Sequence, residues 1–325
     1  DGMKPTRQAA PLFLLILLFA PVGIVAPKAL VPLLFIVALW LLLRRWRHGQ
    51  LRRPFHGHAF LLATAAIIWA LVSGLWALDA TAALWTAARL AGIAVSALIV
   101  ADGLKDLDTG DRRPLSWALL AAFALAALLL GLESLSGGAA HRWWLDWVGK
   151  PDDFETTVLN RAEAVLLLAA WPSALVLDRL GQRRHWAWAV APIVVAVAVA
   201  MLGVSNSNQV AAAVAVVGAV LAWWTGPWLQ RFLAGLLVAG VLAAPLLPTT
   251  LLAPERLTGY FDENHYSGLH RLYIWRFAAQ RIGEAPILGW GLDASRRIPG
   301  GDTKLSGGGN VMSVHPHNAS LQVWL

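Results

Sequence analysis

The sequence predicts an all-α membrane protein, a polytopic bundle of transmembrane helices with one large exterior loop. Of its 325 residues, 58% are hydrophobic and 14% are charged, whereas ordinary soluble domains contain about a quarter charged residues. Apolar runs long enough to cross a hydrocarbon core of about 30 Å recur along the chain. Every backbone polar group in lipid must be paired within its own segment, so these runs are expected to be helices rather than barrel strands.

Nine spans and the start of a tenth follow from the apolar runs. The nine are predicted at residues 9–25, 28–43, 58–77, 81–101, 114–135, 158–177, 186–203, 209–224 and 231–248. The stretch PVGIVAPK favours a tight turn between the first two spans over one kinked helix. The chain then divides into the spans at residues 1–248, a loop at residues 249–317, and the start of a tenth span at residues 318–325.

Lysine and arginine are distributed unequally between alternate connections, and this sets the predicted orientation. With the N-terminus in the cytoplasm, the cytoplasmic side receives fourteen: Lys4, Arg7, Arg44, Arg45, Arg47, Arg52, Arg53, Lys105, Arg112, Arg113, Arg179, Arg183, Arg184 and Arg231. The short connections opposite hold three: Lys28, Arg142 and Lys150. The loop at residues 249–317 therefore faces the exterior. The net charge of +7 then reflects contacts with membrane lipids, and no nucleic-acid partner is expected.

The exterior loop contains one amphipathic pattern. Apolar residues recur at helical spacing in GLHRLYIWRFAAQRIGEAP, which predicts a helix over residues 268–286 near the membrane surface. Three arginines lie between them: Arg271, Arg276 and Arg281. They can contact lipid phosphates from an interfacial helix, or they can clamp a phosphorylated lipid substrate through the planar guanidinium. The pattern alone leaves both interpretations open.

Two stretches at the end of the chain resemble the signature segment of the O-antigen ligase and polymerase superfamily. They are HRLYIWRFAAQRIGEAPILGWGLDAS and HPHNASLQVWL. Together they contain an Arg three residues before an aliphatic-Trp pair, a Pro-x-x-Gly-x-Gly turn, and a His-Asn pair that opens the next helix. The resemblance implies a metal-independent glycosyltransferase of type C architecture that needs no cofactor.

Members of this superfamily move a glycan from an undecaprenyl diphosphate carrier to an acceptor hydroxyl at the periplasmic face. The resemblance therefore implies a multi-pass protein of the bacterial inner membrane with a periplasmic active site. The activity it favours is that of an O-antigen ligase, whose acceptor is lipid A-core. The alternative within the superfamily is a polymerase of O-antigen or exopolysaccharide, whose acceptor is the growing glycan.

Carried over to this sequence, the resemblance assigns the acceptor-activating histidine to His317 and a diphosphate-binding arginine to Arg271. The chemistry agrees, because a sugar hydroxyl needs a base, usually a histidine, and arginines can stabilise a leaving diphosphate without a metal. Asn318, His315 and Arg276 are expected to support them. Outside the resemblance, His317 could equally be a helix-capping or interfacial histidine.

Charged residues within predicted spans add two further candidates, because such residues are costly in lipid and usually face a functional cavity. Arg161 in LNRAEAVLLLAAWP is the second expected diphosphate ligand, since NRAE resembles an Asn-Arg stretch of the family. Arg89 in LWTAARLAG is the third. Alternatively, Arg161 reaches towards the interface and pairs with Glu163.

One stretch departs from the family pattern. Many relatives carry a Ser-Arg pair between the seventh and eighth spans, where this chain reads GVSNSNQVAAA with Asn206, Asn208 and Gln209. Either these neutral amides contact the substrate, or Arg161 and Arg89 supply the charge. The sequence does not decide between them.

Other functional interpretations are weaker. The histidines of HPH with His265, His270, Asp262 and Glu263 could bind zinc, but their spacing fits no established zinc motif, so no metal is expected. The glycine-rich GGDTKLSGGGN is interpreted as a mobile segment over the site. Trp143, Trp144 and Trp147 can stack on sugars or form an interfacial aromatic belt.

A transporter or flippase of an anionic lipid-linked substrate is the competing class of function. Transporters often have matched broken helices in two halves, and no such pairing is evident here. The candidate chemical residues gather in one exterior loop, which favours a transferase.

Overall fold

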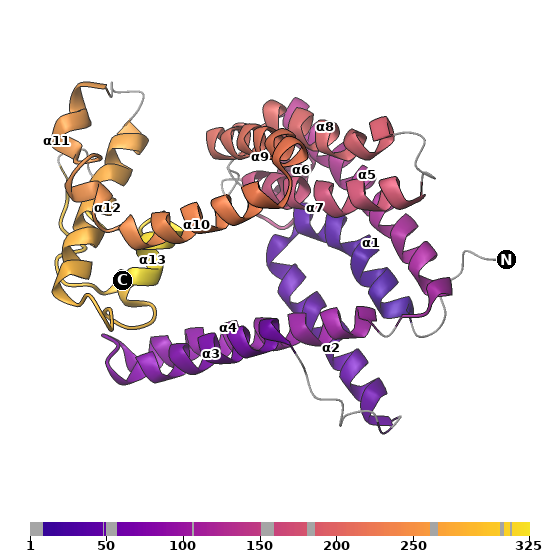
Figure 1. Ribbon diagram of the computed structural model, residues 1–325, viewed down its shortest axis with the longest axis horizontal. Coiled ribbons are helices and arrows are strands. Elements are labelled where there is room, and N and C mark those ends of the chain that lie inside the picture. The colour runs from indigo at the N-terminus through magenta and orange to yellow at the C-terminus, as the bar shows by residue number, and fades with distance from the viewer. Residues whose placement is uncertain are drawn as a thin grey trace. The chain divides into compact units, whose positions relative to one another are not determined.

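The computed structural model describes residues 9–47, 49, 57–105, 107–150, 159–180, 186–260, 266–305, 309–312 and 314–325. Within these ranges, extended pairing is limited to an isolated bridge between Lys304 and Asn310. The α-helices are α1 (Ala10–Val25), α2 (Leu30–Arg47), α3 (His58–Val72), α4 (Ala80–Lys105), α5 (Thr109–Leu135), α6 (Ala139–Trp147), α7 (Leu159–Leu180), α8 (Trp186–Leu202), α9 (Asn206–Thr225), α10 (Pro227–Ala243), α11 (Pro254–Leu257), α12 (Tyr266–Glu284) and α13 (Ala319–Trp324) (Figure 1). The all-α prediction is confirmed.

Three described helical segments are long and apolar enough to cross a membrane: His58–Leu75, Ala80–Lys105 and Gly110–Leu135. Four shorter apolar segments are Ala10–Ile24, Trp188–Leu202, Asn206–Leu221 and Pro227–Ala243. Large apolar side chains such as Leu62, Leu168 and Leu237 are exposed on these and neighbouring helices, as expected of faces that contact lipid. The helices therefore fit a membrane protein, while the number and orientation of the spans stay predictions.

The predicted turn between the first two spans is confirmed. Helix α1 continues through Pro21 to Val25, and the break consists of Ala26 and a short 3-10 turn at Pro27–Ala29. The Ala26 amide still donates to the carbonyl of Val22 over 2.8 Å. Pro21 lacks a backbone donor and its ring crowds the carbonyl four residues earlier, yet it does not end α1, which stops just before Pro27.

Helix α6, a nine-residue helix in the connection after α5, was not predicted from the sequence. The buried carboxylate of Glu133 accepts from the amides of Ala140 and His141 over 2.8 and 3.1 Å, which satisfies free donors at the start of α6. Trp143 and Trp147 lie exposed on this helix. Exposure suits either role predicted for these tryptophans.

The chain forms two compact units, one from residues 1–55 and 95–224 and the other from residues 56–94 and 225–325. In the first unit, α1, α5, α7 and α8 pack around a core that includes Phe123, Leu130 and Leu166. Buried alanines such as Ala170 and Ala196 let these helices approach closely. This core holds the first turn of α7 in place, where Arg161 is found.

In the second unit, α12 packs on α11, α13 and the 3-10 turn at Leu247–Thr249. Its apolar face is buried in the protein, with Ile274 1% and Ala278 0% exposed. The helix predicted at residues 268–286 is therefore present, but its apolar face lies in the core. An interfacial helix would bury that face in lipid instead.

The Pro-x-x-Gly-x-Gly segment after α12 requires glycine at two positions. Gly289 and Gly291 have φ of 66° and 88°, a region that favours glycine. A Cβ on Gly291 would lie 2.5 Å from the Cα of Ala77, and the Trp290 amide donates to the Leu325 carbonyl over 2.6 Å. This turn therefore binds α12, α13 and the α3–α4 connection into one unit.

Candidate functional site

His317 lies in the loop just before α13, on a backbone that its neighbours hold in place. Its φ of 52° is in the left-handed region, which residues other than glycine adopt rarely and only where the surroundings fix them. The indole of Trp275 donates to the carbonyl of buried Pro316 over 2.9 Å, and the His317 amide donates to Nδ1 of His315 over 3.2 Å. The backbone is fixed while the His317 side chain stays exposed.

The residue that caps α13 is Asn318. Its side-chain oxygen accepts from the Leu321 amide over 3.2 Å, which is the usual N-cap interaction. The capping alternative for His317 is therefore wrong. The imidazole of His317 is left available for another role.

Basic side chains around His317 change its protonation. Partial burial of the ring lowers the pKa of His317, because a charged imidazole would lose solvation there. Coulombic repulsion from His315 and His270, when they are protonated, and from Arg271 lowers the pKa further. The structure thus brings these three residues to His317 and favours the neutral imidazole, which is the form that can accept a proton.

The three arginines of α12 differ in their partners. Arg276 forms an ion pair with Glu255, and Arg281 pairs with Glu284 over 2.9 Å and lies over the ring of Phe277. Within the described part of the chain, Arg271 forms no ion pair with a carboxylate and its side chain is exposed. Arg276 therefore serves to hold α12 to α11, while Arg271 keeps its charge available beside His317.

His270 has a structural role that its sequence context did not reveal. Its Nε2 lies 2.8 Å from the backbone oxygen of Asn310, so this nitrogen carries the proton. Gly309 packs on the same ring so closely that a Cβ would lie 2.7 Å from it. The bond joins α12 to a segment 40 residues away along the chain, which a local pattern cannot predict.

In the other unit, Arg161 lies exposed on the first turn of α7, and Glu163 is 1% exposed. The Glu163 carboxylate accepts from the side-chain amide of Asn208 over 2.9 Å. The pair between Arg161 and Glu163 is therefore not formed, because residues two apart on a helix point in different directions. Glu163 has a neutral partner from α9 instead.

Arg89, the weakest of the predicted ligands, lies exposed on α4. It belongs to the same unit as His317 but is not among the groups that shift the pKa of His317. The structure therefore gathers Arg271, His315 and His317 and shows no such relation for Arg89.

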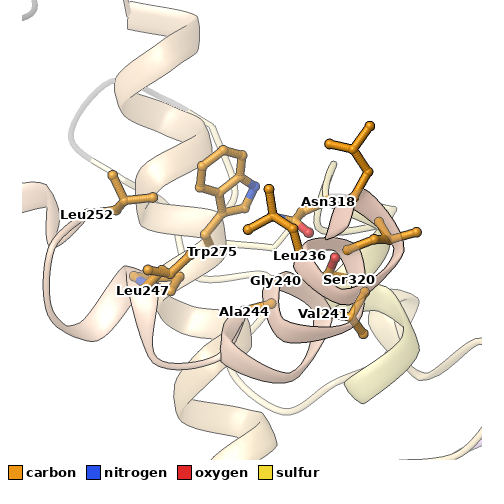
Figure 2. A pocket seen from close by; sticks show the side chains of 12 residues that line it. Leu236, Gly240, Val241, Ala244, Leu247, Leu252, Trp275, Asn318 and Ser320 are labelled. Atoms are coloured by element: carbon orange, nitrogen blue, oxygen red, sulfur yellow. The ribbon is translucent and has the colours of Figure 1, made fainter. Parts of the chain in front are cut away.

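An apolar cavity of about 440 Å³ lies next to this cluster. Figure 2 shows that side chains from α10, the following turn, Trp275 and the start of α13 surround it. Asn318 and Ser320 provide polar atoms at one side of a lining that is otherwise mostly aliphatic. The cavity thus adjoins the residue next to His317 and could take an apolar chain.

Comparison with known proteins supports the resemblance. Residues 191–325, which include α12, His317 and Asn318, match the family model described as O-antigen ligase. This part of the chain is similar to the O-antigen ligase superfamily. The resemblance in its two terminal stretches is therefore confirmed.

Relatives of this chain occur in Rickettsia. The "Putative polysaccharide ligase" of Rickettsia conorii is 27% identical over 219 residues, which cover 66% of this chain and 51% of that protein. The protein of the same name from Rickettsia felis is 26% identical over 220 residues, 66% of this chain and 52% of the relative. The chain thus spans about half the length of these relatives. No solved structure matches it.

Several possible zinc ligands fall outside the described residues: Asp262, Glu263 and His265. Among the residues that are described, no group of three or more histidines and acids could hold a metal ion. Of the remaining histidines, His270 uses Nε2 to bind a carbonyl and His315 uses Nδ1 to accept an amide.

The glycine-rich segment is only partly described, since residues 306–308 lie outside the described ranges. On either side of them the chain pairs with itself: the Leu305 amide donates to Gly309 and the Val311 amide donates to Thr303, both over 2.8 Å. Met312 is 3% exposed in the core. These flanks are therefore anchored, and the lid predicted for this segment stays a prediction.

Proposed function

We propose that this protein is a membrane glycosyltransferase, specifically an O-antigen ligase that moves a glycan from undecaprenyl diphosphate to a hydroxyl of lipid A-core at the periplasmic face. The observation that carries the proposal is the pairing of His317, whose pKa is lowered, with Arg271, whose guanidinium has no carboxylate partner among the described residues. Both lie in the segment that matches the O-antigen ligase family.

In the proposed reaction, neutral His317 takes the proton from the acceptor hydroxyl as its oxygen attacks the anomeric carbon of the donor. The bond between that carbon and the diphosphate oxygen breaks, and its electron pair leaves with the diphosphate. Arg271 stabilises the charge that develops there, and Arg161 is the second proposed ligand. The products are the glycosylated acceptor and undecaprenyl diphosphate, and the imidazolium returns its proton to water.

The apolar cavity supports a lipid-linked donor. It is lined by α10 and adjoins Asn318, so an isoprenoid chain could lie there while its head group extends to His317 and Arg271. The names of the Rickettsia relatives favour the ligase over the polymerase.

The acceptor distinguishes the candidates within the superfamily. Purified protein in liposomes is supplied with glycan-charged undecaprenyl diphosphate and lipid A-core, and the lipid products are separated by mass. Glycan joined to lipid A-core is expected. Lengthened glycan on the carrier would instead identify a polymerase. Intact donor that has crossed the bilayer, with no new glycosidic bond, would identify a flippase.

The pH dependence of transfer should reflect the lowered pKa of His317. The base acts only when neutral, so activity is lost as the pH falls through this pKa. Since the folded pKa is below the ordinary histidine value of about 6.5, the acid limb of kcat/KM is expected below that pH. His315→Ala removes a group that disfavours a proton on His317 when it is itself protonated, and should move the limb to higher pH. An acid limb above pH 6.5, or one that His315→Ala leaves in place, would contradict this assignment.

Chelation should leave the transfer reaction intact, because arginines rather than a metal are proposed to balance the diphosphate charge. The measurement is turnover before and after treatment with EDTA, together with the metal content of the purified protein. Stoichiometric zinc whose removal abolishes turnover, and whose return restores it, would overturn the arginine mechanism.

A further inference from the structure

Asn208, one of the three amides in the stretch where many relatives carry a Ser-Arg pair, is bonded to two residues of the helical turn that contains Arg161. Its side-chain nitrogen lies 2.8 Å from the backbone oxygen of Asn160 and 2.9 Å from the carboxylate of Glu163. All of these residues belong to the same unit. An amide nitrogen has two hydrogens, so both are used within the protein. Asn208 is therefore not free to bind a phosphate.

Asn208 and its partner Glu163 are both buried in the protein. Asn208 is 9% and Glu163 1% exposed, and a buried carboxylate is costly unless it accepts hydrogen bonds. Gly203 packs directly on this carboxylate, where a Cβ would overlap it. Gln209 donates to the Gly203 carbonyl over 3.0 Å, so its amide is also used internally. The start of α9 is thus built around Glu163.

Helix geometry links this arrangement to Arg161. Asn160 and Glu163 both lie on the first turn of α7, so two bonds from one side chain fix that turn. Glu163 follows Arg161 by two residues, which places it about 200° around the helix. Holding Glu163 inward therefore holds Arg161 outward, in agreement with its exposure.

We infer that Asn208 is a positioning residue for Arg161, acting through Asn160 and Glu163 rather than by contact with the substrate. The inference rests on the proposed role of Arg161 in holding the donor diphosphate. It also answers the question that the sequence leaves open: at Asn208, the amide does not replace the family arginine but orients another one.

The test is a double-mutant cycle in transfer by the reconstituted chain. Replacing both partners, Glu163→Leu with Asn208→Leu, removes the bonds without leaving a buried charge, which protects folding. This change is expected to raise the KM for the undecaprenyl-diphosphate-linked donor about tenfold. In an Arg161→Ala background the same change should alter the KM by less than about twofold. The pair is proposed to affect the KM only by positioning Arg161, so it has no further effect once that side chain is absent.

Two controls accompany the cycle. Ser207→Ala alters an exposed neighbour on the same turn of α9 and should leave the KM unchanged. Glu163→Gln keeps an oxygen acceptor for Asn208 and should restore a donor KM near that of the unaltered protein. Rescue of this kind is not expected if the carboxylate charge itself contacts the substrate.

The outcomes separate this inference from the proposed function. An equal rise in KM with and without Arg161, or loss of thermal stability with an unchanged KM, would show that the pair serves packing alone and would overturn the inference. A normal KM in Arg161→Ala would show that Arg161 is not a diphosphate ligand, and Asn208 would then have no ligand to position. Absence of transfer by the unaltered chain would instead count against the proposed function.

Discussion

Replacing His317 with alanine is expected to abolish glycan transfer while leaving the lipid-linked donor bound. The imidazole is the proposed base for the acceptor hydroxyl, and such a base contributes roughly 10²- to 10⁴-fold to the rate. Donor binding should persist because the diphosphate is proposed to contact arginines. Turnover and donor affinity are measured separately, the first by product formation and the second by binding of donor to detergent-solubilised protein.

His315→Ala is the matched control for this prediction. His315 lies beside His317, with ring centroids 4.2 Å apart, but it acts on the backbone by accepting the His317 amide. Its replacement should cost far less turnover at neutral pH. Normal turnover in His317→Ala, or failure of that variant to bind donor, would show that the general-base role is wrong.

Replacing Arg271 with lysine is expected to reduce turnover on the order of 10²-fold with normal expression. Lysine keeps the charge but loses the planar fork that binds two phosphate oxygens together. The same is expected of Arg161→Lys. The measurements are initial transfer rates and the amount of folded protein recovered from membranes.

Arg281→Lys provides a control on the same helix as Arg271. Arg281 is paired with Glu284 and faces Phe277, so its replacement should affect turnover little. If Arg271→Lys and Arg161→Lys both keep nearly full transfer, these arginines contact membrane lipids and are not diphosphate ligands.

Much of the helical framework could be predicted from the sequence because apolar runs and helix ends are local signals. The helix at residues 268–286, the glycine turn after it and the helix that starts at Asn318 all follow from short patterns. The break before Pro27, where the first predicted span ends, is a local signal of the same kind. One helix was missed, because α6 is too short and too polar to form an apolar run.

The contacts within the candidate site could not be predicted in the same way. Asn208 binds Glu163 across 45 residues, and His270 binds Asn310 across 40. Arg276 differs from Arg271 because it forms an ion pair with Glu255. In the sequence, both arginines lie between the apolar residues of the same amphipathic pattern. Such partners are chosen by tertiary packing, so the amphipathic pattern alone did not distinguish the arginines of α12; the resemblance selected Arg271, and the structure shows which of the others have carboxylate partners.

The central claim is that this protein breaks and forms a glycosidic bond, and one measurement tests it most directly. Purified chain is mixed with acceptor and with donor labelled in both the glycan and the carrier, and the two labels are followed through a single turnover. Equal amounts of glycosylated acceptor and free undecaprenyl diphosphate are predicted, with neither formed by His317→Ala. Donor that keeps both labels together, whether or not it crosses the bilayer, would contradict the account.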